Sequence, residues 1–243
     1  MSRSKYKKRN RNLTITLIFL IAYLIYALFT SEINNFIYSY AYKNNSYSIS
    51  EIPEYNGHSY VYINDNIPEF SKEDMATNSF EKYSDLDLFG RAGVAYANIG
   101  KDLMPTEKRE SIGMIKPSGW QLTKYDFVDG KYLYNRCHLI GFQLTGENAN
   151  EKNLITCTRT TNAKVMVEFE NKVAKYIRKT NNHVLYRVTP IYDKANLVAS
   201  GIQIEALSVE DDGKGIKFNV YIYNVEKNVV IDYRNGESKL KES

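Results

Sequence analysis

The part of the sequence that most constrains the fold is the stretch of residues 134–177. It begins within the apolar and tyrosine-rich run KYLYNRCHLIGF, which predicts a strand that carries His138. The segment TGENANEKN follows, and its glycine and asparagine residues are typical of turns. Residues 163–179 then place apolar side chains at helical spacing, with charged side chains between them. The stretch therefore predicts a strand with a histidine, a loop, and a helix that begins at Asn162.

This arrangement contains the groups that a hydrated metal ion needs to hydrolyse a phosphodiester. Histidine is the side chain best suited to remove a proton from water near neutral pH. Mg²⁺ keeps most of its waters and binds few protein ligands. One asparagine oxygen together with a phosphate of the substrate is therefore enough, and a cluster of acidic residues is not required.

The same stretch resembles the DNA/RNA non-specific endonucleases of the ββα-metal superfamily. Their signature, Asp-Arg-Gly-His, matches Asn135, Arg136, Cys137 and His138. The resemblance covers roughly residues 55–237, and it includes the segments DLFGRAGVA (87–95), MPTE (104–107) and KPSGW (116–120) and the strand-like residues 184–192 and 218–233.

The resemblance implies roles for the polar residues of this stretch. His138 matches the general base of the family, and Asn162 matches its metal-binding asparagine. Asn153, in NEKNL, matches a second asparagine that supports the site. Glu170, in FENKV, matches a glutamate in the outer environment of the metal. Mg²⁺ is the expected metal, with Mn²⁺ as a substitute.

Two positions depart from the family signature. Asn135 stands where the family has aspartate, so a hydrogen-bond acceptor is kept and a charge is lost. Cys137 stands where the family has glycine, so the backbone there must accommodate a Cβ atom. Neither change affects the base or the metal ligand, so the expected reaction is the same, while its rate and metal preference stay open.

The charge of the chain is unevenly distributed. The net charge is +4, but six basic residues lie within the first twelve residues, and without them 26 basic and 28 acidic side chains remain. The remainder must therefore bind nucleic acid through a local patch. Basic residues near the central stretch are Arg136, Lys152, Arg159, Lys164, Lys172, Lys175, Arg178 and Lys179. They indicate either a phosphate-binding surface, with Arg136 and Arg159 among its members, or an ordinary solvated helix face.

Arg91 is a further candidate for binding phosphate, because guanidinium groups bind phosphate oxygens through two hydrogen bonds. It lies in GRAGVAYANI (90–99), and the family has an arginine by the site near this position. A buried arginine paired within the structure is the alternative.

The N-terminal part predicts a membrane anchor. Residues 13–29 carry no charge, follow six basic residues, and would form a helix about 26 Å long, the short end for a bilayer span. The expected organisation is a cytoplasmic tail (1–12), a transmembrane anchor (13–30), a polar tether (31–54), a domain outside the cell (55–237) and a frayed tail (238–243). A cleaved signal peptide, with secretion of the domain, is the alternative. A buried helix of a soluble protein would not need the six cations.

The domain itself is expected to be α+β, with a central, largely antiparallel sheet and packed helices. Residues 78–86 are expected to be irregular. The single tryptophan, Trp120, is expected to pack in the core, with stacking on a base as the alternative. Strands are expected at residues 60–65, 90–99, 183–192, 202–209, 217–225 and 229–233.

Other histidines and the cysteines give weaker signals. His58 is expected at the surface and His183 in a structural role. Cys137 and Cys157 flank the site, and a disulfide between them is permitted outside the cell, although the sequence does not establish that the two side chains meet. A Cys137–His138 nucleophile is rejected because neighbouring side chains on a strand point to opposite faces. A zinc site is rejected because ligands at usable spacings are lacking.

The resemblance therefore implies a Mg²⁺-dependent endonuclease that acts on DNA, and on RNA as well, and leaves 5′ phosphates. The predicted anchor resembles that of membrane-bound streptococcal members of the family. This resemblance favours a role in DNA uptake over scavenging of nucleic acid or attack on competitors. The main alternative is a weak or inactive nuclease fold that binds nucleic acid at the cell surface, which the asparagine at position 135 supports. The sequence leaves the oligomeric state open.

Overall fold

The computed structural model describes Thr16, Leu20, Ile21, Tyr23 and residues 52–242. Thr16, Leu20, Ile21 and Tyr23 are helical and belong to one unit, Met1–Lys43. Residues 52–242 belong to a second unit, Asn44–Ser243. The predicted cytoplasmic tail, most of the anchor and most of the tether lie outside the described residues. Over the described part of the chain, no helix is both long and apolar enough to cross a membrane.

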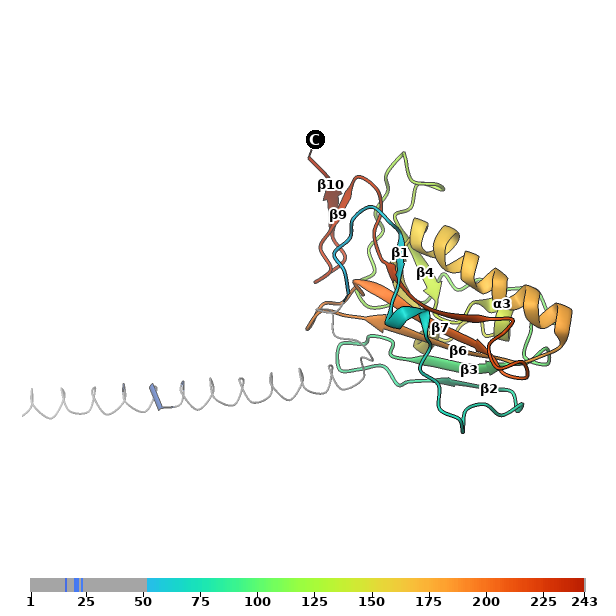
Figure 1. Ribbon diagram of the computed structural model, residues 1–243. Helices are drawn as coiled ribbons and strands as arrows, with labels where there is room; N and C mark the ends of the chain where they lie inside the picture. Colours follow the sequence, from blue (N-terminus) through green and yellow to red (C-terminus); the bar gives the residue numbers. More distant parts are fainter. Residues whose placement is uncertain (1–15, 17–19, 22, 24–51, 243) are drawn as a thin grey trace, which may run out of the picture. The chain divides into compact units, whose positions relative to one another are not determined.

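The domain is built on an antiparallel sheet of six strands (Figure 1), which agrees with the predicted central, largely antiparallel sheet. Each neighbouring pair of strands is antiparallel. In their order across the sheet the strands are β1 (Tyr60–Tyr62), β8 (Lys217–Tyr223), β7 (Gly201–Ser208), β6 (Val184–Ile191), β3 (Ala95–Ile99) and β2 (Phe80–Tyr83).

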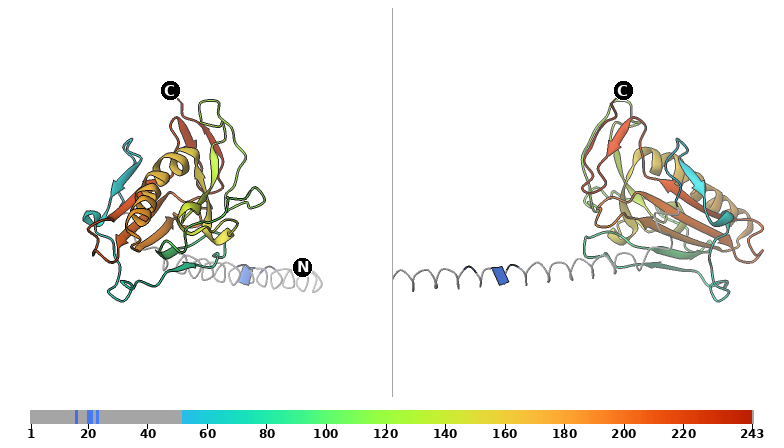
Figure 2. Two further views of the ribbon diagram at one scale, coloured as in Figure 1. Left: turned by 90° about the vertical axis from the view of Figure 1, so that its right-hand side faces the viewer. Right: turned by 60° about the vertical axis from the view of Figure 1, so that its left-hand side comes forward.

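The long helix lies across one face of this sheet (Figures 1 and 2). It opens as the π-helix η4 (Thr161–Met166) and continues as α3 (Val167–Thr180), which ends at Asn181 in the left-handed conformation. Phe169 on its buried face lies 5.1 Å, ring to ring, from Phe218 of β8. The apolar stripe seen in the sequence is thus the face that the helix buries against the sheet.

Two contacts hold the start of the helix. The Thr158 hydroxyl accepts a hydrogen bond of 3.1 Å from the Thr161 amide. The carboxylate of Glu226 accepts hydrogen bonds from the Thr160 amide and hydroxyl, at 3.1 and 2.7 Å. Both acceptors satisfy donors at a helix N-terminus, and the carboxylate also complements the helix dipole. They therefore determine where Asn162 lies.

A separate pair of strands leads into the helix. β4 (Tyr134–His138) and β5 (Leu154–Thr158) are antiparallel, and the short helices α2 (Phe142–Thr145) and η3 (Glu151–Asn153) lie between them in sequence. Residues of β4, β5 and α3 share one hydrophobic core with the sheet. The order β4, β5, α3 is the strand–strand–helix unit that the resemblance implied.

Several expected elements differ at their ends. Residues 78–86 contain β2, which pairs with β3, and are not irregular throughout. β1 stops at Tyr62 because the turn η2 (Asn64–Asn66), with positive φ angles, follows it. The expected frayed tail forms β10 (Ser238–Leu240), which pairs with β9 (Val229–Ile231). The backbone hydrogen bonds between β9 and β10 explain why this polar segment is ordered.

Candidate active site

A cleft with a volume of about 400 Å³ lies where β4, the start of the long helix and the connection from β3 to β4 meet. It contains three arginines and no carboxylate, so it suits an anionic ligand. The residues that line it are Arg109, Ile112, Trp120, Leu122, Tyr132, Tyr134, Asn135, Arg136, Arg159 and Asn162. Of the predicted site residues, the structure thus brings Arg136, Arg159 and Asn162 to one cleft.

His138 lies at the end of β4 and is buried. Its Nε2 donates to the backbone carbonyl of Asn148 at 2.7 Å. Because a carbonyl only accepts, the ring proton is on Nε2, and the lone pair is on Nδ1. Arg109, which lines the cleft, places Nη2 3.3 Å from Nδ1. The basic nitrogen of His138 therefore points to a cleft residue.

Burial sets the protonation state of His138. Burial, with a smaller contribution from the charge of Arg109, lowers the pKa to about 4, although the hydrogen bond to Asn148 opposes the shift. The imidazole is therefore neutral at pH 7. A neutral imidazole is the form that a general base requires, and here its Nδ1 accepts the hydrogen bond from Arg109.

Asn162 lies in the π-helical turn that opens the long helix. It is half-buried and lines the cleft. Within residues 52–242 its side chain has no hydrogen-bond partner, so its amide oxygen is free for a ligand. An amide oxygen is a hard donor that suits Mg²⁺. No group of three or more His, Cys, Asp or Glu side chains in the described residues is placed to hold a metal. The residues thus fit a cation that shares its coordination with a bound phosphate.

Glu170 lies on α3, is buried, and contacts the loop that follows β4. Its pKa is raised to about 7 because burial outweighs two opposing effects, the hydrogen bond of 3.3 Å from Gln143 Nε2 and the charge of Arg109. The carboxyl group packs against Gly141, where a Cβ atom would collide with it. Glu170 therefore needs glycine at position 141, and it is coupled to the cleft through Arg109.

Asn153 is buried and acts on the backbone. Its Oδ1 accepts from the Ile140 amide at 2.9 Å, and its Nδ2 donates to the Ile140 carbonyl at 3.0 Å. Both ends of the side-chain amide are therefore used to hold the loop that follows His138. This geometry supports a positioning role for Asn153.

Arg136 organises the connection that forms one side of the cleft. It donates to the carbonyl of Gly113 at 2.7 Å and to that of Ile115, and its guanidinium lies 4.1 Å from the centre of the Trp120 ring. Trp120 is half-buried and lines the cleft, so its expected place in the core is wrong. The stacked guanidinium holds the indole at the cleft.

The other two arginines have different environments. Arg159 is 35% exposed, lines the cleft and pairs with Asp129 at 2.9 Å. Arg91 is only 3% exposed; it pairs with Asp87 at 2.7 Å and donates to the carbonyls of Lys194 and Asn196. Of the two alternatives for Arg91, the structure thus shows the buried, internally paired arginine, because the fold uses these donors. It does not line the cleft with Asn162.

Arg109 is the residue that the sequence analysis missed. It lies between the segments 104–107 and 116–120, which both resemble the family. This position between two family-like segments is the one feature of the sequence that points to Arg109. Its sequence neighbours, Lys108 and Glu110, are charged and exposed in the same way, so nothing local marks it out.

The remaining histidines are structural or exposed. His58 is exposed, as expected. His183 Nδ1 lies 2.7 Å from Glu210 Oε1, which agrees with its expected structural role. The two cysteines form a disulfide between β4 and β5, with a Cα–Cα distance of 5.9 Å. The sequence left open whether the two cysteines pair, and the structure shows a disulfide next to His138.

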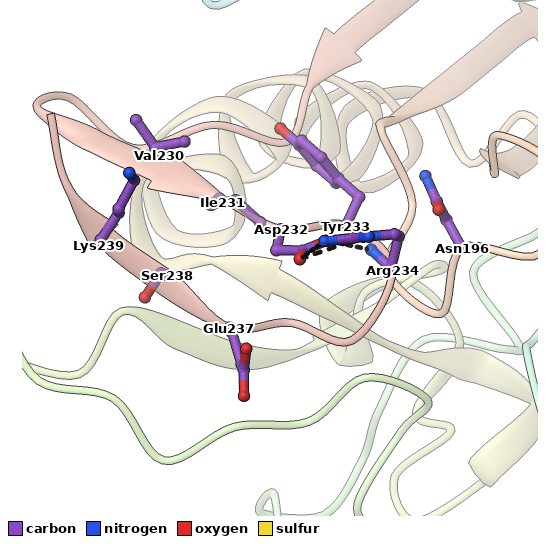
Figure 3. Close-up of a pocket in the computed structure, with 9 residues that line it drawn as sticks. All are labelled: Asn196, Val230, Ile231, Asp232, Tyr233, Arg234, Glu237, Ser238 and Lys239. Atoms are coloured by element: carbon purple, nitrogen blue, oxygen red, sulfur yellow. Dashed lines mark hydrogen bonds and ion pairs between the residues drawn. The ribbon is translucent and has the colours of Figure 1, made fainter.

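A larger cavity, of about 600 Å³, lies along the C-terminal strands β9 and β10 (Figure 3). Asp232 and Arg234 lie side by side in it and form an ion pair of 2.6 Å. None of the predicted site residues lines this cavity. It is therefore not the candidate site, despite its size.

Comparison with known proteins agrees with this geometry. The sequence profile of the DNA/RNA non-specific endonuclease family matches residues 71–210, more than half of the chain. The crystal structure of NucA from Streptococcus agalactiae with bound magnesium is 25% identical and has a TM-score of 0.65, covering 74% of this chain and 85% of NucA. The metal-free form has a TM-score of 0.67, with 83% and 95% covered and the same identity. The Sda1 nuclease with a bound zinc ion is 27% identical, with a TM-score of 0.59 over 81% of this chain and 100% of Sda1.

Proposed function

This chain belongs to the DNA/RNA non-specific endonuclease family, and we propose that it hydrolyses phosphodiester bonds of DNA, and of RNA as well, at the cleft that contains Asn162. The observation that supports this most strongly is the state of His138. It is neutral, its tautomer is set by the Asn148 carbonyl, and its unprotonated Nδ1 accepts a hydrogen bond from Arg109 of the cleft.

In this proposal His138 Nδ1 takes the proton from the attacking water. Arg109 binds the scissile phosphate, which draws its guanidinium from Nδ1 and leaves the lone pair to the water. Arg159 contacts the neighbouring phosphate, and Arg136 holds the loop that carries Arg109. Asn153 and Glu170 keep the loop after β4 in place. We expect products with 5′ phosphates, as the family implies.

Asn162 is the residue proposed to hold a divalent cation. When bound, the cation would neutralise charge on the scissile phosphate and the leaving oxygen. Mg²⁺ is proposed, with Mn²⁺ as a substitute, because the donor at Asn162 is an oxygen. NucA carries magnesium and Sda1 carries zinc in their structures, so other divalent ions belong in the test.

A second candidate function rests on Asn135, which lines the cleft where the family has aspartate. The missing carboxylate supports a protein that binds nucleic acid at the cell surface without cleaving it. Such a protein would bind DNA with a strong dependence on salt and would show no turnover.

The proposed location is the outer face of the cell membrane, with residues 13–30 as the anchor. The support is the uncharged run after six basic residues. Secretion after signal cleavage is the alternative. Proteomic detection of the intact N-terminal peptide in the membrane fraction would support the anchor, and a mature chain that begins after residue 30 would support secretion. DNA uptake is the proposed role.

The test of activity uses the full-length chain and plasmid DNA. Wild type, His138→Ala and Asn162→Ala are compared with Mg²⁺, with other divalent ions, and with chelator. We expect cleavage by wild type only when metal is present, and a loss of about 100-fold or more in each variant. Wild type that binds plasmid and leaves it intact with every metal would contradict the nuclease and favour the binding protein. In that case Asn135→Asp is the variant to make next.

A further inference from the structure

One wall of the cleft carries exposed apolar side chains close to its arginines. Leu122 is 74% exposed and Tyr132 is 42% exposed, and both line the cleft with Arg159 and Asn162. Leaving such side chains in water is unfavourable. Exposed apolar side chains that line a cleft together with charged groups are a common sign of a ligand site.

This wall is an ordered part of the fold. Leu133 donates its amide to the Thr123 carbonyl at 3.0 Å, and Tyr125 donates to the Lys131 carbonyl at 2.8 Å. The wall also rests on the C-terminal hairpin, because the Tyr134 hydroxyl donates to the Gly236 carbonyl at 2.9 Å. Leu122 and Tyr132 are therefore exposed on a segment whose backbone is held by hydrogen bonds.

The aromatic rings of the wall are held at the cleft by cations. The Lys124 ammonium lies 4.5 Å from the centre of the Tyr132 ring, and the Arg136 guanidinium lies 4.1 Å from the centre of the Trp120 ring. Proteins that bind single-stranded nucleic acid combine aromatic faces with arginines: the arginines attract the phosphate backbone, and the rings stack on the bases.

We propose that Tyr132, with Leu122 and Trp120, stacks on an unpaired base next to the phosphate that is cleaved, so that single-stranded DNA or RNA is the preferred substrate. Within a duplex the faces of each base are covered by its neighbours, and a ring at the cleft wall reaches a face only after the base is unstacked. This inference rests on the proposed function, since it places the base beside the phosphate at Asn162.

The test measures binding separately from cleavage. The full-length chain with His138→Ala is titrated with a fluorescent single strand and with the same sequence as a duplex, in Mg²⁺, by fluorescence anisotropy. Adding Tyr132→Ala should weaken single-strand binding about tenfold and leave duplex binding nearly unchanged. Tyr132→Phe should retain single-strand binding because the ring is kept. Leu122→Ala, at a more exposed position, is a second variant should Tyr132→Ala unfold.

Phe127 provides the matched control. It is an exposed aromatic residue of the same segment, 52% exposed, but it stacks on Tyr125 and does not line the cleft. Phe127→Ala should leave both affinities unchanged. The proposal is overturned if Tyr132→Ala and Leu122→Ala leave single-strand binding unchanged, or weaken both forms of DNA equally. Cleavage by the chain with His138 intact is measured in parallel: its absence, with the Tyr132 effect retained, contradicts the proposed function and leaves the stacking wall in place.

Discussion

His138 and Glu170 are both buried, and burial shifts their pKa values in opposite directions. The pKa of His138 falls to about 4, from 6.5, so the unfolded chain takes up the proton first and stability rises with pH between these values. The pKa of Glu170 rises to about 7, from 4.5, so the unfolded chain loses its proton first and stability falls as pH rises between these values. The two residues thus change the free energy of unfolding with pH in opposite directions.

The Glu170 effect can be isolated by Glu170→Gln, which removes the titration and keeps the shape. We expect the variant to gain about 3 kcal/mol in free energy of unfolding relative to wild type as pH rises from about 4 to about 8. Urea unfolding with chelator measures this difference. Glu168→Gln, on the exposed side of the same helix, is the control for the loss of a carboxylate. Parallel curves for Glu170→Gln and wild type would show that the carboxyl group is not desolvated.

Arg109 is expected to act on both the phosphate and the base. In Arg109→Ala, kcat/KM should fall about 10- to 100-fold, because a charged hydrogen bond to phosphate is lost. The acidic limb of the pH–rate profile should also move to higher pH, because the Arg109 charge no longer lowers the pKa of His138. Lys108→Ala, the exposed neighbour, should change neither. An unchanged acidic limb in Arg109→Ala would show that Arg109 does not affect the pKa of the base.

At the scale of elements, the strand–strand–helix unit depends on how β4 and β5 are joined. The ladder from Tyr134 to His138 is reinforced by the disulfide between Cys137 and Cys157 and is extended by Asn153, which binds the backbone of Ile140. The caps at Thr158 and Glu226 then set the start of the helix. His138 lies at the end of β4 and Asn162 in the π-helix that follows β5, so the pairing of β4 with β5 and the two caps together place both residues.

The disulfide is expected to stabilise this unit. It closes a loop with a sequence separation of 20, for which chain entropy predicts about 3 kcal/mol. Urea unfolding with and without reductant should show a loss of about this size. The variant with both Cys137→Ala and Cys157→Ala should be insensitive to reductant. Wild type whose cysteines are shown by mass spectrometry to be reduced, yet whose stability is unchanged, would contradict the prediction.

At the scale of the whole molecule, the charge that faces the substrate is local. Beyond its first twelve residues the chain carries 26 basic and 28 acidic side chains, and the three arginines of the cleft stand out against this balance. Binding should therefore depend on a few phosphate contacts in the cleft.

The dependence of duplex affinity on salt tests this. For the two phosphate contacts proposed for Arg109 and Arg159, the slope of log affinity against log salt should be about −2, measured with His138→Ala to prevent cleavage. Arg159→Ala should make the slope shallower by about one. A slope near −8 in the parent would instead show that the lysines along α3 form an extended binding surface.

Much of the architecture could be predicted because it depends on local patterns. The alternation of apolar residues predicted the strands β6, β7 and β8, and helical spacing predicted α3 together with the face that it buries. The positions of His138 and Asn162 followed from the same patterns and from the family signature. The roles proposed for these two residues stay predictions, since their placement alone does not test them.

The partners of each side chain were decided by the tertiary structure. Arg91 is buried against Asp87 and carbonyls from residues more than a hundred positions away, whereas Arg109, in an unremarkable charged run, reaches His138. Trp120 lies at the cleft because Arg136 stacks on it, and β10 is a strand because β9 offers it hydrogen bonds. The sequence by itself determined the period of each element, because neighbouring residues alone set that period. Which charges meet, and which donors stay free, depends on how distant segments pack, and no local pattern contains that information.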